Sequence, residues 1–210
     1  MNTTAPLLGE PIAVELMNTI WADRDGVHDA LASAEQAQAW LHAIAPRVQA
    51  IALDAQPTPA ALPAEVVASR LRSLRDALRR LAAEATGDPR ATARSTTADV
   101  QTAVAELNGA AAGAPRWSSL QWSDHELASP VRIAHATAGP DAAFISEIAE
   151  QGIDLLAGAG SEQLRACLAP GCVLYFVKNH PRREWCSASC GNRARVARHY
   201  RRHHGDPAPS

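Results

Sequence analysis

Four cysteines near the C-terminus set the tightest limits on the fold of this chain. Cys167 and Cys172 are separated by four residues, Cys186 and Cys190 by three, and thirteen residues separate the two pairs. Paired thiolates on two tight loops supply the four soft ligands that zinc takes in structural sites. We therefore predict one structural Zn²⁺ per chain, held by all four cysteines. Four thiolates leave no open position for water, so the predicted ion is not catalytic.

Two disulfides and four buried free thiols are the alternatives to zinc. The N-terminus lacks a basic segment and reaches Glu10 and Glu15 early, so we expect no secretory signal and a cytoplasmic protein. Stable disulfides are disfavoured in that compartment. Free cysteines of a hydrophobic core rarely all fall into two close pairs within so short a stretch. The spacing therefore favours the metal.

The residues between the cysteines predict the local fold. Pro170 and Gly171 allow the first loop to double back, and residues 173–177 form a strand candidate. A helix is expected after Cys186, with Cys190 in its first turn, where the helix N-terminus favours thiolate over thiol. This order predicts a treble-clef-like zinc finger.

Charge is divided unevenly along the chain. Residues 1–163 hold 11 Arg and 20 acidic residues, whereas residues 164–205 hold nine Lys or Arg and one Glu. A basic segment on an otherwise acidic chain predicts a polyanionic partner. DNA is the partner that we expect. An acidic protein surface, an acidic part of this chain, and simple solvation of the basic segment are the alternatives.

The predicted helix after Cys190 carries an arginine stripe. At 100° per residue, Arg195, Arg198 and Arg202 fall within an arc of about 60°. Val196 and Tyr200 lie on the opposite side, and we expect them to pack against the zinc module. The predicted nucleic-acid-binding residues are Arg182, Arg183, Arg193, Arg195, Arg198, Arg201 and Arg202. For Arg193, a hydrogen bond to backbone or thiolate is an equally favoured role.

The rest of the chain favours packed helices, because hydrophobic residues make up 47% and aromatic residues only 4%. Apolar periodicity predicts helices, and a change to alternation predicts a β-hairpin near 116–137. The helices are expected at 12–20, 33–44, 63–86, 97–107 and 141–156. In the third helix Leu71, Leu74 and Leu78 form one face and Arg70, Arg72, Arg75, Arg79 and Arg80 the other.

The predicted fold is mainly α with a small β-hairpin, in the α+β class. Residues 1–160 form a helical regulatory domain, and the segment Gly158–Ser161 is its boundary. Residues 161–205 form the zinc finger and 206–210 a disordered tail. No apolar run reaches the roughly 18 residues of a membrane span, so no membrane partner is expected.

Two segments resemble known families. Cys190-Gly-Asn-Arg193, preceded by Trp185-Cys186-Ser187, is the signature of the CGNR zinc finger family. Leu16-Met-Asn18-Thr19 and Trp40-Leu41 resemble the ABATE domain, which accompanies that finger and is described as a stress-induced transcription regulator. The resemblance implies a DNA-binding regulator of transcription in the stress response. A zinc-stabilised protein-interaction module without direct DNA binding is the alternative.

We expect no enzyme. The chain has no phosphate-binding glycine loop, nucleophile elbow or H-E-x-x-H motif. Asp124-His125-Glu126 is adjacent in a predicted loop, where the three side chains point in different directions. Trp21, Trp40, Trp117 and Trp122 are core candidates that could instead line a small-molecule effector pocket. A homodimer is also left open.

Overall fold

The computed structural model describes residues 5–47, 52–53, 62–90, 95–122, 127–134 and 139–204. Most of the described chain is helical, as the sequence predicts. The helices are α1 (Ile12–Met17), α2 (Ala34–Ile44), α3 (Ala64–Thr86), α4 (Val100–Ala112), α5 (Pro140–Ala157) and α6 (Ala188–His204), with 3-10 turns η1 (Ala45–Arg47) and η2 (Ser161–Gln163).

The strands form three small sheets. The predicted hairpin is present, with β4 (Arg116–Gln121) antiparallel to β5 (Ser129–Ala134) and the short β3 (Ala52–Leu53) parallel to β5. A second hairpin of β1 (Ile20–Asp23) and β2 (Gly26–Asp29) follows α1 in a segment where we expected no strand. The third sheet pairs β6 (Leu164–Ala166) with β7 (Tyr175–Val177).

Local signals account for several helix ends. Ser33 and Gln36 form a capping box at the start of α2, and α3 ends at Gly87, whose φ of 59° is left-handed. Asp99 caps α4, which continues to Ala112, five residues beyond the end that we expected at 107. Asp141, where we expected this helix to start, does not cap α5, whose N-cap is Gly139 without a side-chain hydrogen bond. The Asp141 carboxylate instead accepts a hydrogen bond from the Leu62 amide at 2.8 Å.

The arginine face of α3 is only partly exposed to solvent. Leu71, Leu74 and Leu78 are buried as expected, but Arg75 and Arg79 are buried too. Helical periodicity separates apolar from polar residues and gives no sign that a second module will cover the polar side.

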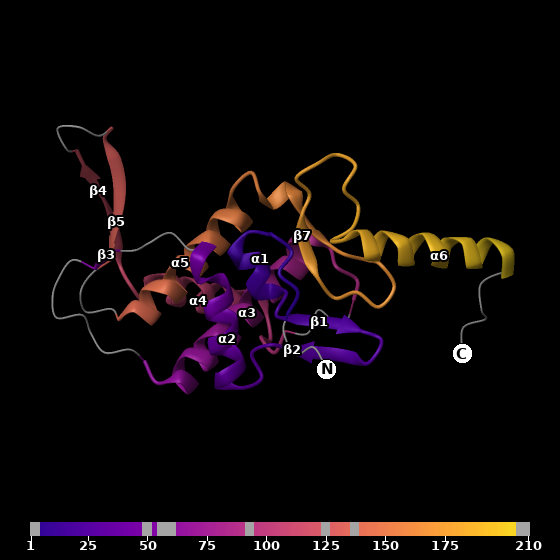
Figure 1. Cartoon of the computed structure of the whole chain (residues 1–210), viewed down its shortest axis with the longest axis horizontal. Coiled ribbons are helices and arrows are strands. Elements are labelled where there is room, and N and C mark those ends of the chain that lie inside the picture. The colour runs from indigo at the N-terminus through magenta and orange to yellow at the C-terminus, as the bar shows by residue number, and fades with distance from the viewer. Residues whose placement is uncertain are drawn as a thin grey trace.

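Figure 1 shows how these elements are arranged. α1, α3, α4 and α5 form the centre, the β4–β5 hairpin projects at one end, and α6 projects at the opposite end. One continuous core joins Leu16 and Leu71 of the N-terminal body (residues 5–163) to Tyr175 and Phe176 of the cysteine module (residues 164–204).

None of the helices in the described ranges is long and apolar enough to cross a membrane. Three prolines predict a loop at 54–63, of which residues 54–61 lie outside the described residues. The Asp124-His125-Glu126 trio and the tail at 206–210 also lie outside them.

Candidate metal centre and the helix that follows it

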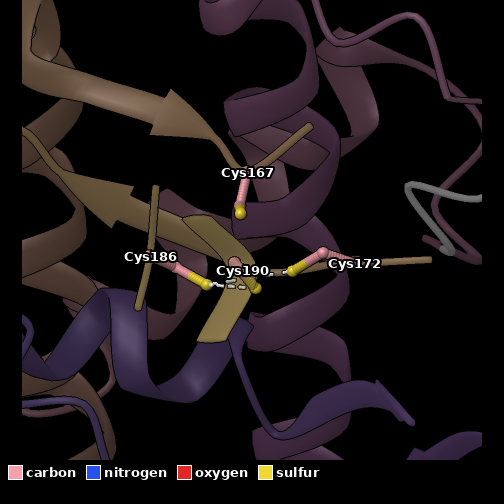
Figure 2. Close-up of side chains that lie close together, drawn as sticks. All are labelled: Cys167, Cys172, Cys186 and Cys190. Atoms are coloured by element: carbon pink, nitrogen blue, oxygen red, sulfur yellow. Dashed lines mark hydrogen bonds between the residues drawn. The ribbon is translucent and has the colours of Figure 1, made fainter. Parts of the chain in front are cut away.

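The four cysteines converge on one point (Figure 2). All are buried, and their sulfurs lie within 4.8 Å of one another. The Cys172–Cys186 and Cys186–Cys190 sulfur distances are 3.8 and 3.4 Å. Zinc–sulfur bonds of about 2.3 Å in a tetrahedron require sulfur separations of about 3.8 Å. The donor set therefore fits one zinc ion.

The first cysteine loop lies between β6 and β7. Cys167 donates its amide to the Leu174 carbonyl at 2.9 Å, and Cys172 donates to the Ala169 carbonyl at 2.9 Å. Gly171 has a φ of 72°, a conformation that side chains rarely adopt, which explains why the predicted turn needs glycine there.

The second cysteine pair is fixed by the start of α6. The Ser187 hydroxyl accepts a hydrogen bond from the Cys190 amide at 3.3 Å, as an N-cap residue does. Gly191 lies under Trp185, and a Cβ at this position would stand 3.2 Å from the indole ring. The glycine thus lets the helix approach the tryptophan closely.

The thiols are electrostatically linked. Hydrogen bonding from Cys172 and Cys186 lowers the pKa of Cys167 to about 2. The same contact with Cys167 raises the pKa of Cys172 to about 12, and contacts with Cys167 and Cys172 raise the pKa of Cys186. Each thiolate makes the next proton harder to remove. A divalent cation supplies the charge that allows four thiolates to lie this close together.

Arg193 serves the metal centre. Its Nη2 donates to the Cys190 sulfur at 3.0 Å, and this hydrogen bond raises the pKa of the Arg193 guanidinium. Of the two roles expected for Arg193, the contact seen is the one to a thiolate. Outer groups of this kind orient metal ligands and stabilise their charged form.

The N-terminal body holds the first cysteine loop through Arg90. Its Nη1 donates to the carbonyls of Cys167 and Cys172 at 3.0 and 2.7 Å. Asp88 forms an ion pair with Arg90 at 2.5 Å and accepts a hydrogen bond from the Tyr175 hydroxyl at 2.9 Å. The metal centre is therefore attached to the end of α3.

Two buried side chains join β7 and its approach to the N-terminal body. Asn18 pairs with the backbone of Tyr175 in both directions, each hydrogen bond being 2.9 Å. Arg79, with no exposed surface, donates to the carbonyls of Met17 and Val173 at 2.7 and 3.1 Å. The sequence carried no signal for these contacts, apart from the position of Asn18 in the Leu-x-Asn-Thr segment.

Beyond the metal centre, α6 projects away from the rest of the protein (Figure 1). Ala194 is its last buried residue, and Ala197 alone among residues 195–203 is partly covered. The expectation that Val196 and Tyr200 pack against the zinc module is wrong, since they are 69% and 58% exposed. The helix extends past the surface that was expected to cover them.

The predicted nucleic-acid-binding arginines divide into two groups. Arg183 forms an ion pair with Glu10, donates to the Val177 carbonyl at 3.0 Å, and lies over the Phe176 ring. Together with Arg193, it is occupied within the protein. The exposed members are Arg182, Arg195, Arg198, Arg201 and Arg202.

The four tryptophans do not share an effector pocket. Trp21 and Trp40 are buried in the core, whereas Trp117 and Trp122 are exposed on the projecting hairpin. The pattern that suggested a common pocket therefore joins residues from two different environments.

Comparison with known proteins gives two family matches. Residues 10–159 match the ABATE family, described as "Putative stress-induced transcription regulator", and residues 163–203 match the CGNR zinc finger. No curated protein matches the chain. The finger match and the four converging cysteines together confirm the prediction of a single structural zinc site.

Proposed function

Since this chain belongs to the ABATE family and ends in a CGNR zinc finger, we propose that it regulates transcription by binding DNA through α6. The zinc ion would be structural. Bound by the four thiolates, it fixes the start of α6 against β7 and so sets the direction in which the helix projects. Neither family is an enzyme family, and the proposal assigns the chain no reaction.

The observation that carries the proposal is the exposure of the arginines on α6. Arg195, Arg198 and Arg202 are exposed on one side of a helix that extends beyond the rest of the protein. Arg201 and Arg182 are exposed nearby. Guanidinium groups suit phosphate oxygens and the edge of guanine, and a projecting helix is the element that enters a major groove.

The test is to replace Arg195, Arg198 and Arg202 together with alanine in the full-length chain. Fluorescence anisotropy with a labelled DNA duplex then measures affinity. We expect the loss of three phosphate contacts to weaken binding at least tenfold at moderate salt. Zinc content should stay at one ion per chain, because none of the three touches a cysteine.

The matched control is the triple variant Arg24→Ala, Arg70→Ala and Arg165→Ala. These arginines are exposed in other parts of the molecule, so the variant loses the same charge without changing α6. It should bind DNA nearly as tightly as the unmodified protein. Equal losses of DNA affinity in the two variants would show that only the net charge matters. That result would contradict DNA binding through α6.

An apolar groove beside α6 supports the alternative function of a protein-interaction module. The groove has a volume of about 990 Å³, and its lining includes Leu168, Trp185, Val196 and Tyr200. Arg193, Arg198 and Arg201 also line it. Its chemistry fits an apolar peptide segment with acidic flanks.

The double substitution Val196→Ser and Tyr200→Ser separates the two functions. It removes apolar contacts and leaves every arginine in place. DNA affinity should be unchanged if DNA is the partner of α6. Absence of salt-dependent DNA binding by the unmodified protein would favour the protein-interaction module.

A further inference from the structure

The β4–β5 hairpin projects from the body and exposes an unusual set of side chains. Trp117, Leu120 and Trp122 are 44%, 67% and 76% exposed, and Leu127 is 94% exposed. Figure 1 shows the hairpin standing away from the helices, at the end opposite α6. Single exposed apolar residues are common on protein surfaces, but four of them on one hairpin indicate an interaction site.

Among the described residues, no strand pairs with the outer edge of β4. In the described part of the chain, the sheet order is β3-β5-β4, so β4 pairs on one side only. Natural edge strands are usually protected by charge, proline or a bulge. The segment 117–122 reads Trp-Ser-Ser-Leu-Gln-Trp and contains neither a charge nor a proline.

The base of the hairpin is rigidly attached. Arg116, whose side chain is buried, forms ion pairs with Glu147 at 2.7 Å and Glu150 at 2.5 Å, both on α5. The projecting strands are therefore held in a fixed direction, and the position of β4 does not depend on a partner.

We propose that two copies of this chain associate through β4. Each strand would pair with an antiparallel copy of itself across a twofold axis, which joins the two sheets into one. A surface that meets its own copy must avoid like charges, and the uncharged segment 117–122 meets that condition. The inference is independent of the proposed DNA binding.

Both faces of the hairpin contribute surface to this pairing. Side chains alternate along a strand, so Trp117 lies on one face of β4, and Leu120 and the following Trp122 lie on the other. The exposed apolar side chains together offer on the order of several hundred Å², since a single aromatic side chain has about 150–250 Å² of surface. Each partner in a standard interface buries roughly 800 Å², so the backbone edge of β4 would supply the remainder.

Light scattering coupled to gel filtration tests the proposal on the full-length, zinc-loaded protein. We expect the unmodified chain to have twice the 22.3 kDa mass of one copy. The double variant Leu120→Glu and Trp122→Glu should have the mass of one copy, because paired negative charges would meet at the axis. The milder Leu120→Ser and Trp122→Ser variant should shift the equilibrium in the same direction.

Val66→Glu is a control for the added charge, since Val66 is an exposed apolar residue on α3, away from β4. It should stay dimeric, as should Val196→Glu on α6. Zinc content and circular dichroism confirm that each variant is folded. A monomeric unmodified protein at high concentration overturns the proposal, and so does a dimer that survives both β4 double variants.

Discussion

The guanidinium of Arg193 is hydrogen-bonded to the zinc ligand Cys190, so its loss should weaken zinc binding. Arg193→Ala removes the hydrogen bond of 3.0 Å to the Cys190 sulfur. We expect zinc affinity to fall roughly 10- to 100-fold, the usual effect of removing an outer group. Competition with a chromophoric chelator measures this. Arg195→Ala, two residues further along α6, should leave zinc affinity unchanged; an equal effect in both variants would contradict the assignment.

The Asn18 side chain bonds the backbone of β7 as a neighbouring strand would. Its removal should destabilise the whole protein. Asn18→Ala leaves the buried amide and carbonyl of Tyr175 without hydrogen bonds. We expect a loss of about 2–4 kcal/mol in the free energy of unfolding, measured by urea denaturation. The exposed Asn192 gives a control, because Asn192→Ala should cost little. A small effect at Asn18 would show that water replaces the lost contacts.

The residues that can be predicted from the sequence are those whose partners are near in the chain. The cysteine spacing predicts the metal site because two short loops carry all four ligands. Asn18 and Tyr175 are 157 positions apart, and Arg79 and Val173 are 94 apart. Spacing predicts no such pairing, and an arginine on a helix looks the same whether it faces solvent or a second module.

The junction between α3 and β7 should respond to acid through Asp88. Burial raises its pKa, but hydrogen bonds from Arg90 and Tyr175 outweigh this and hold the pKa of the carboxyl below its usual value. A lowered pKa stabilises the fold above the unfolded value of about 3.9, and the stabilisation is lost as pH falls further.

Asp88→Asn should therefore be less stable than the unmodified protein at neutral pH, and the difference should shrink as pH falls through about 4 toward 3. Urea denaturation at a series of pH values measures the difference, with the zinc content of both proteins followed at each pH. A difference that stays constant with pH would show that Asp88 acts through packing and not through its charge.

At the level of elements, capping and periodicity predicted α2, α3 and the β4–β5 hairpin well. The β1–β2 hairpin was missed, because its strands of four residues are too short to show an alternating pattern. The buried face expected for α6 was wrong for a different reason. Amphipathic spacing shows which side of a helix would pack, and gives no indication of whether a surface is present there.

The N-terminal body and the cysteine module share one core, so zinc removal should affect both. Stripping the metal with a chelator leaves four crowded thiols and releases the contacts of Arg90 and Tyr175. We expect the near-ultraviolet circular dichroism of the buried Trp21 and Trp40, which lie in the N-terminal body, to weaken. An unchanged signal would contradict the coupling, and restored zinc should restore it.

This shared core changes how regulation can work. Asn18, Arg79 and Glu10 make buried contacts that hold the cysteine module against the N-terminal body. A signal in the N-terminal body therefore does not act by releasing an independently moving zinc finger. If the chain regulates transcription as proposed, its control would act on the binding of partners to α6 or on the association of copies. Both ends of the molecule that project, α6 and the β4–β5 hairpin, are suited to such contacts.

The salt dependence of DNA affinity tests the role of α6 most directly. With about five exposed arginines on phosphates, the logarithm of the association constant should fall against the logarithm of salt concentration with a slope of about −4 to −5. Replacement of Arg195, Arg198 and Arg202 by alanine should reduce the slope to about −2. A slope near zero, or one that the triple variant leaves unchanged, would contradict the account.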